Sequence, residues 1–314
     1  MKHVILIFEQ DKTYMESPPA KPPLLNPPWL RVIVFVLLYL VINLLAYRLL
    51  DSGVSVFTTF ANLIGKISGS PDTEFNFILL SLLASFILSV LLVILFTKMV
   101  DRRDISSLGF EYRGYLPDCI VGFMIPVIIL GTASLILYFT KSLEWTDISF
   151  TSEDFLNGLF LMIVIAIGEE MVFRGYILNN LMQSLNRWLA LAISAALFAL
   201  MHSNNPNVDV VAMINLFAGG LLLGINYVFT RNLWFSIFLH TAWNFLQGPV
   251  LGFPVSGVNL PGILEHELKG NTLLTGGPFG LESSIITGIL LILSILILYI
   301  AYRSRAERNA FPSV

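Results

Sequence analysis

Ile165-Ala-Ile-Gly-Glu169-Glu170-Met-Val-Phe-Arg174-Gly-Tyr176 is a stretch of charged residues inside one of the long apolar runs of the chain. Two carboxylates and a guanidinium therefore stand where apolar residues are expected. A charged side chain at the centre of a membrane span costs about 2.5 to 3.5 kcal/mol on insertion scales. We expect the fold to compensate these charges from neighbouring helices, and we interpret them as the mark of a functional site.

The composition of the whole chain points to a membrane protein. Of the 314 residues, 56% are hydrophobic and 12% are charged, with a mean hydropathy of +0.79. A soluble domain carries about 25% charged residues, so lipid is the expected solvent here. The net charge of −3 and the lack of a basic stripe argue against a nucleic-acid partner. Cys119 is the only cysteine, which excludes an intramolecular disulfide and a cysteine-based metal cluster.

Apolar runs of about 20 residues can cross the hydrocarbon layer as helices. They predict an all-α fold, a polytopic membrane bundle of about eight transmembrane helices. The predicted spans are residues 30–49, 75–98, 118–140, 155–183, 188–203, 208–229, 232–249 and 284–302.

The pattern predicts one membrane domain, residues 30–303, between two cytosolic tails, residues 1–29 and 304–314. The first tail is polar and rich in proline, and it lacks the features of a cleavable signal peptide. Residues 52–70 are apolar but interrupted by polar residues, which favours an interfacial helix over a span. Residues 250–283, rich in Gly and Pro, are expected to form a long outer loop.

The distribution of basic residues predicts the orientation. If the amino terminus is cytosolic, fourteen of the eighteen Lys and Arg residues fall in inner segments. The four in outer segments are Arg48, Lys66, Lys141 and Lys269. This bias follows the positive-inside rule and predicts that both termini are cytosolic.

The spacing of the charged residues suggests different roles for the two glutamates. Glu170 and Arg174 are four residues apart, so they lie on one helix face in the order that favours an ion pair. Glu169 is rotated by about 100° from Glu170 and has no partner in its own helix, which suits a general base. The alternative is that both glutamates only join helices through ion pairs.

Two histidines and an asparagine accompany these charges in later spans. His202 ends an apolar helix, and His240 and Asn244 lie one turn apart on another. A single membrane histidine is often no more than a hydrogen bond between helices. Two of them, together with Glu169 and an asparagine on the same face as His240, favour a shared site.

Helix lengths test whether these residues can meet. Glu169 and His202 are each about 25 Å from the polar turn near Asn186, at about 1.5 Å per residue, so they can face each other. His240 is only about 14 Å from Arg231 on the same basis. It can reach the same level only if the turn at 183–188 projects further into the cytosol.

Several known membrane sites do not fit the sequence. It contains no H-E-x-x-H zinc motif, no G-x-G-D motif with a second membrane aspartate, no G-x-S-x-G serine motif and no E-x-x-H partners of a di-iron bundle. Instead, three motifs follow one another along the chain, in the predicted helices 155–183, 188–203 and 232–249: Glu169-Glu170-x-x-x-Arg174, Phe198-x-x-x-His202 and His240-x-x-x-Asn244.

In these motifs the chain resembles the CAAX prenyl endopeptidase family, also called CPBP or Abi, over about residues 155–250. The stretches 102–109 and 276–282 are also similar to it. The resemblance implies an eight-helix bundle that hydrolyses peptide bonds of membrane-associated proteins or peptides, with the protease core at about 155–250. In eukaryotic members the substrates are prenylated proteins. Compact members occur in bacteria, so the expected location is a bacterial cell membrane.

The resemblance also implies roles for the motif residues. Glu169 would activate the attacking water, and His202 would help to position it. His240 and Asn244 would stabilise the oxyanion.

Glu170 and Arg174 would support the site. A catalytic Zn²⁺ held by Glu169, His202 and His240, with water as the fourth ligand, is one possible mechanism. Catalysis by Glu169 without a metal is the other.

Outside this family, a secondary transporter or proton relay would also use membrane Glu and His residues, but it predicts inverted repeats that the sequence lacks. A third hypothesis is a scaffold without catalytic activity that binds membrane partners through the same fold.

Overall fold

The computed structural model describes residues 22–51 and 73–310. The predicted interfacial helix at 52–70 and most of the predicted first tail lie outside these residues. The main helices are α2 (Pro28–Asp51), α4 (Thr73–Leu95), α5 (Leu116–Phe139), α6 (Ser152–Glu170), α8 (Arg187–Met201), α9 (Val210–Thr230), α10 (Trp234–Phe245) and α12 (Ile285–Ala310).

Shorter elements extend or join these helices. Three π-helical segments lengthen their predecessors: η2 (Phe96–Val100) after α4, η4 (Met171–Leu178) between α6 and α7 (Asn179–Leu181), and η5 (Leu246–Val250) after α10. The connections contain η3 (Ile105–Leu108), β1 (Leu143–Ile148), β2 (Leu264–Leu268), α11 (Thr272–Thr275), η6 (Gly277–Phe279) and η7 (Leu281–Ser283).

The predicted helical membrane fold is confirmed. Each of the eight predicted spans coincides with a helix, and within the described residues six helical segments are long and apolar enough to cross a membrane. The other two predicted spans, 188–203 and 232–249, correspond to shorter helices: α8 has 15 residues, and α10 has 12 before it continues into η5.

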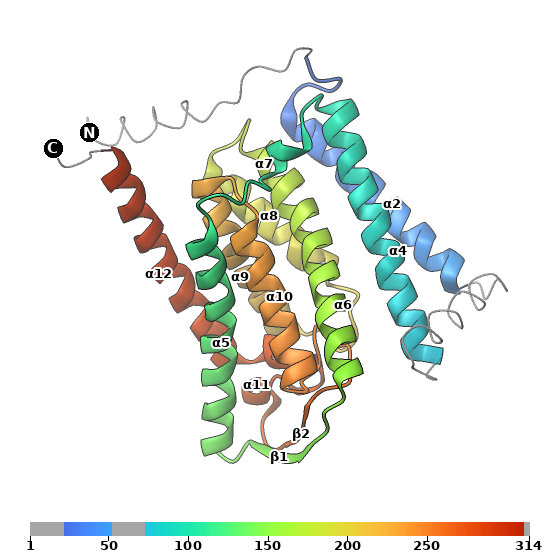
Figure 1. Cartoon of the computed structure of the whole chain (residues 1–314), viewed down its shortest axis with the longest axis vertical. Helices are drawn as coiled ribbons and strands as arrows, with labels where there is room; N and C mark the ends of the chain where they lie inside the picture. The colour runs from blue at the N-terminus through green and yellow to red at the C-terminus, as the bar shows by residue number, and fades with distance from the viewer. Residues whose placement is uncertain (1–21, 52–72, 311–314) are drawn as a thin grey trace.

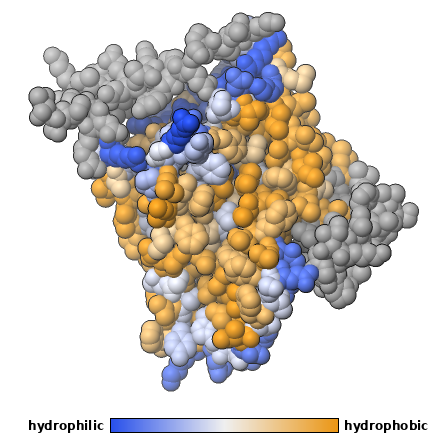
Figure 2. All heavy atoms as spheres, in the orientation of Figure 1, coloured by the Kyte–Doolittle hydropathy of each residue, from blue (hydrophilic) through white to orange (hydrophobic). Residues whose placement is uncertain are grey.

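The surface agrees with lipid as the solvent. Figure 2 shows apolar residues over the sides of the molecule and hydrophilic residues gathered toward its ends. Large apolar side chains are exposed on the outer faces of α2, α4, α5, α6 and α12, among them Leu37, Leu91, Ile128, Phe160 and Ile297. A soluble monomer rarely exposes so much continuous apolar surface.

Two details differ from the sequence-based expectations. Helix α12 continues to Ala310, so the predicted tail from residue 304 is largely helical. The bundle also carries a small antiparallel sheet, β1 with β2, in which Leu143 faces Leu268. The predicted outer loop contains β2 and α11, and this sheet lies at the end of the bundle away from the carboxyl end of α12 (Figure 1).

Helices α6, α8, α9 and α10 form the centre of the bundle (Figure 1). Helix α8 packs on α9, α10 packs on α5 and α6, and α12 covers α9. The α8–α9 contact depends on small residues, because a Cβ added to Gly220 would lie 2.9 Å from the Cα of Ala195. Small residues thus allow the two helices to pack closely.

A buried polar cluster fixes the end of the helix that carries the glutamates. The Asp101 carboxylate pairs with Arg31 Nη1 at 3.1 Å and accepts hydrogen bonds from Tyr176 Oη at 3.3 Å and Asn180 Nδ2 at 3.0 Å. These contacts tie α2 and η2 to the η4–α7 segment. They hold that segment in one register relative to the amino-terminal helices.

Candidate active site

The Glu170–Arg174 ion pair expected from the spacing is present at the centre of the bundle. Arg174 Nη1 lies 2.8 Å from Glu170 Oε1, and both side chains are buried. Arg174 Nη2 donates to the carbonyl of Gly220 at 3.0 Å, and its guanidinium lies 4.7 Å from the centre of the Phe198 ring. The arginine therefore joins α9 and α8 to the acidic helix.

The helix changes to a π-helical form directly after Glu170. All eight residues of η4, Met171–Leu178, are buried, and the carbonyl of Phe173 accepts a hydrogen bond from Ser194 Oγ of α8 at 2.9 Å. π-Helical turns inside α-helices often occur at functional sites. Here the wider turn places Arg174 among α8 and α9.

His240 contacts both glutamates. Its Nδ1 lies 2.8 Å from Glu170 Oε1, and its Nε2 lies 3.9 Å from Glu169 Oε2. Because Glu170 is already paired with Arg174, it is the acceptor, and Nδ1 carries the proton that it accepts. The bond between His240 and Glu170 was not predicted from the sequence.

The turn at 183–188 projects further than Arg231, as the helix lengths require if His240 is to reach the level of Glu169. Arg231 Nη1 donates to Asn179 Oδ1 at 3.0 Å, so the start of α10 is level with Asn179 and the turn at Asn186 projects beyond it. Glu169 is then about 15 Å along the helix from Asn179, at about 1.5 Å per residue, and His240 is about 14 Å from Arg231. The two side chains therefore reach the same depth.

His202 directly follows the last turn of α8. Its Nδ1 lies 2.8 Å from the carbonyl of Phe198, and its ring lies 4.7 Å from the Phe198 ring. The carbonyl can only accept, so Nδ1 carries a proton. Nε2 is then the nitrogen that His202 can present to other groups.

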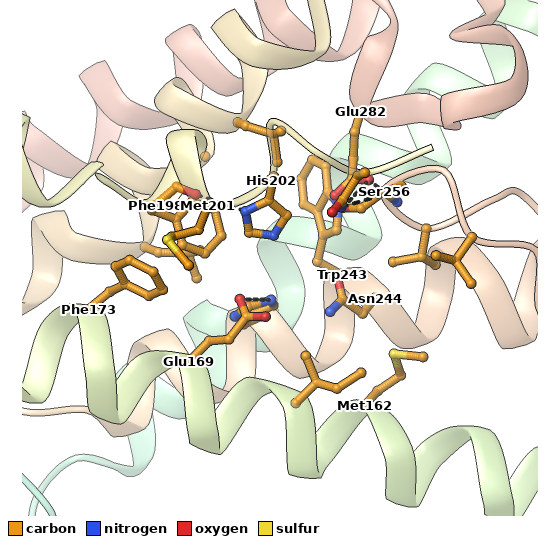
Figure 3. Close-up of a pocket in the computed structure, with 18 of the residues that line it drawn as sticks. Met162, Glu169, Phe173, Phe198, Met201, His202, Trp243, Asn244, Ser256 and Glu282 are labelled. Carbon is orange, nitrogen blue, oxygen red and sulfur yellow. Dashed lines mark hydrogen bonds and ion pairs between the residues drawn. The ribbon is translucent and has the colours of Figure 1, made fainter. Parts of the chain in front are cut away.

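Four of the predicted residues line one cavity of about 370 Å³: Glu169, His202, His240 and Asn244 (Figure 3). Glu169 Oε2 accepts no hydrogen bond from the described residues. The remaining lining is mostly apolar and includes Met162, Phe173 and Trp243. Glu170 and Arg174 do not line the cavity but lie buried behind it.

A second carboxylate lines the cavity, and its role was not predicted. Glu282 in η7 accepts hydrogen bonds on Oε2 from the Ser256 backbone N–H at 2.6 Å, from Ser256 Oγ at 3.0 Å and from Gln247 Nε2 at 3.3 Å. Burial raises the pKa of Glu282 above that of an exposed glutamate. The 276–282 stretch was noted for its resemblance, but a single Glu in a loop carries no spacing that would assign a function.

The fit of a metal ion can be judged from the donor atoms. In the described part of the chain, no three His, Cys, Asp or Glu side chains are gathered as a metal-ligand set. Nδ1 of both His202 and His240 is hydrogen-bonded, so only Nε2 of each histidine could bind a metal, and Glu169 lines the same cavity. As placed, these three side chains are not gathered around one point as the ligands of a bound zinc ion would be.

Comparison with known proteins agrees with the motifs. Residues 151–246 match the model of a family described as type II CAAX prenyl endopeptidase Rce1-like. No curated protein matches the chain. The matched region runs from the start of α6 to the end of α10 and contains all three motifs. The segment 151–246 of this chain is therefore similar to the Rce1-like family of type II CAAX prenyl endopeptidases.

Proposed function

We propose that the protein is an intramembrane endopeptidase that hydrolyses peptide bonds of membrane-associated proteins or peptides. One observation carries the proposal: Glu169, His202, His240 and Asn244, from three separate segments of the chain, line a single cavity within the matched family region. A carboxylate without a hydrogen-bond donor and two imidazoles in such a cavity are groups suited to acid–base catalysis.

Glu169 is the proposed general base. Its Oε2 is 3.9 Å from His240 Nε2, which leaves room for an oxygen atom that contacts both groups. The carboxylate takes a proton from water as the water oxygen attacks the peptide carbonyl. Nε2 of His202, free because Nδ1 binds the Phe198 carbonyl, accepts the second hydrogen of that water and orients it.

His240 and Asn244 are the proposed oxyanion donors. His240 acts here as an imidazolium: its Nδ1–H donates to Glu170, and its second proton, on Nε2, points to the carbonyl oxygen as that oxygen gains negative charge. The Asn244 amide lies one turn further along α10 and supplies a second donor. Arg174 holds Glu170 in place through the 2.8 Å ion pair.

The tetrahedral intermediate then collapses. Glu169 returns its proton to the amide nitrogen, the C–N bond breaks, and the products are a carboxylic acid and an amine. Atoms and protons balance with one water consumed. The low-dielectric surroundings strengthen each of these electrostatic contacts.

We also propose the location of the protein. The basic residues favour an orientation with both termini in the cytosol. The resemblance to compact bacterial members of the family suggests a bacterial cell membrane. The apolar lining of the cavity and the exposed apolar sides of the bundle suit a substrate that reaches the site from the membrane.

Purified variants test the assignment with a membrane-tethered peptide. His240→Ala and Asn244→Ala are expected to lower kcat by about 100-fold or more, as removal of an oxyanion donor does. His202→Ala is expected to lose activity as well. Metal analysis of the active protein belongs to the same experiment: one equivalent of metal, lost in His202→Ala, would replace the metal-free mechanism with a zinc mechanism. Full activity of all three variants would refute the proposal.

A further inference from the structure

The second cavity carboxylate, Glu282, takes no part in the proposed hydrolysis. Glu282 is only 8% exposed, yet it lines the same cavity as Glu169. In the view of Figure 3, Glu169 and Glu282 enter the cavity from opposite sides, with His202 between them. A buried carboxylate is costly unless its charge is compensated.

Hydrogen bonds compensate the charge of this carboxylate at only one of its two oxygen atoms. All three hydrogen bonds from Ser256 and Gln247 end on Oε2. They also fix a tight turn at Ser256, whose φ is +48°. The carbonyl of Ser256 accepts a further hydrogen bond from Asn205 Nδ2 at 3.1 Å. Among the described residues, Oε1 receives no comparable donor.

The cavity lining contains fewer positive than negative groups. The described lining contains two carboxylates, Glu169 and Glu282, and neither lysine nor arginine. The nearest guanidinium, that of Arg174, is already committed to Glu170 and Gly220 behind the cavity. With His240 protonated on both ring nitrogens and His202 neutral, the two carboxylates still leave the lining with one net negative charge, so a cationic occupant is favoured.

We propose that Glu282 is a specificity residue that binds a basic side chain, lysine or arginine, of the peptide in the cavity. This inference rests on the proposed function, because it takes the occupant to be the peptide substrate. Oε1 would accept a hydrogen bond from the ammonium or guanidinium, while Oε2 stays bound to Ser256. Glu282 would then select the substrate and leave the bond cleavage to Glu169.

The test measures binding rather than cleavage. The full chain carrying Glu169→Gln is titrated with pairs of acylated peptides in detergent micelles. The two peptides of a pair differ only in having lysine or norleucine at one position, and that position is moved along the peptide from pair to pair. Norleucine keeps the apolar stem and removes the charge. At one position we expect the lysine peptide to bind at least about 10-fold more tightly.

Glu282→Gln, added to the same chain, keeps the size of the side chain and an oxygen acceptor for Ser256. It should bring the lysine-to-norleucine ratio to about one. Glu265→Gln is the matched control, since Glu265 is exposed on β2 and does not line the cavity. It should leave the ratio unchanged.

The inference would be overturned if the chain that retains Glu282 bound the lysine and norleucine peptides equally at every peptide position. This measurement needs no folded Glu282 variant. An unchanged ratio in Glu282→Gln would also overturn it, and would leave Glu282 only as the anchor of the Ser256 turn. Failure of the proposed function looks different: the chain with intact Glu169 would then cleave neither peptide, whether or not lysine is preferred.

Discussion

At the scale of single residues, Glu170 organises the site without lining the cavity. Its Oε1 contacts both Arg174 and His240 at 2.8 Å, so one buried carboxylate sets the position of a guanidinium and an imidazole. Arg174 adds bonds to Gly220 and a contact with Phe198. A planar guanidinium can make these contacts together, whereas a lysine ammonium cannot reproduce their geometry.

Arg174→Lys is therefore expected to lower the free energy of unfolding by about 2 to 4 kcal/mol, because Glu170 loses part of its buried pairing. Denaturant unfolding in detergent measures the effect. Arg303→Lys is the matched control: Arg303 pairs with Glu307 on the exposed face of α12, and such an exposed pair contributes little to stability. Equal losses in the two variants would contradict the role given to Arg174.

The residue-scale features could be predicted from the sequence only where they depend on one helix. The Glu170–Arg174 pair follows from a spacing of four, and the structure contains it. The bond from His240 to Glu170 depends on how α10 is rotated against α6, which no local pattern encodes. Glu282 was missed for a similar reason, since its partners Ser256 and Gln247 lie on a separate part of the chain.

At the scale of elements, the contact between α8 and α9 decides how closely the motif helices approach. Gly220 and Gly219 are neighbours on α9 in different environments. A Cβ on Gly220 would meet the Ala195 backbone at 2.9 Å, whereas a Cβ on Gly219 would meet nothing within 4 Å. The carbonyl of Gly220 also accepts the bond from Arg174, so separation of the two helices would disturb the ion-pair network.

Gly220→Ala is expected to destabilise the protein by about 1 to 3 kcal/mol, as overpacking in a tight core does. Gly219→Ala is expected to be neutral or slightly stabilising, because alanine favours the helix by up to about 1 kcal/mol. Thermal unfolding of both variants in the same detergent checks the difference. Equal stability of the two would show that the α8–α9 contact can relax.

Elements were predictable to the extent that hydrophobic length defines them. Each apolar run became a helix, because a membrane span must satisfy its backbone hydrogen bonds internally. The β1–β2 sheet was not predicted, since it pairs short segments that are far apart in the chain and have little apolar alternation. The π-helical turn after Glu170 depends on contacts with α8, such as the bond from Ser194.

At the scale of the whole molecule, the apolar sides and polar ends define a membrane-embedded bundle (Figure 2). Figure 1 places the β1–β2 sheet and the carboxyl end of α12 at opposite ends. The proposed cytosolic termini therefore put the sheet on the outer face.

Cysteine labelling in intact cells checks this orientation. Glu267→Cys, exposed on β2, should react with a membrane-impermeant maleimide, and Arg305→Cys, exposed near the end of α12, should react only after permeabilisation. Cys119, the only native cysteine, is buried and should give a low background. The reverse pattern would place the termini outside.

The central claim is that Glu169 activates water for peptide-bond hydrolysis, and the kcat of Glu169→Gln tests it most directly. The substitution keeps the size of the side chain but removes the base, and Glu170 behind it keeps its bonds to Arg174 and His240. With a membrane-tethered peptide we expect kcat to fall by at least about 100-fold, the lower end for general-base catalysis, with unchanged thermal stability. A folded Glu169→Gln protein that cleaves at the rate of the unaltered chain would contradict the claim.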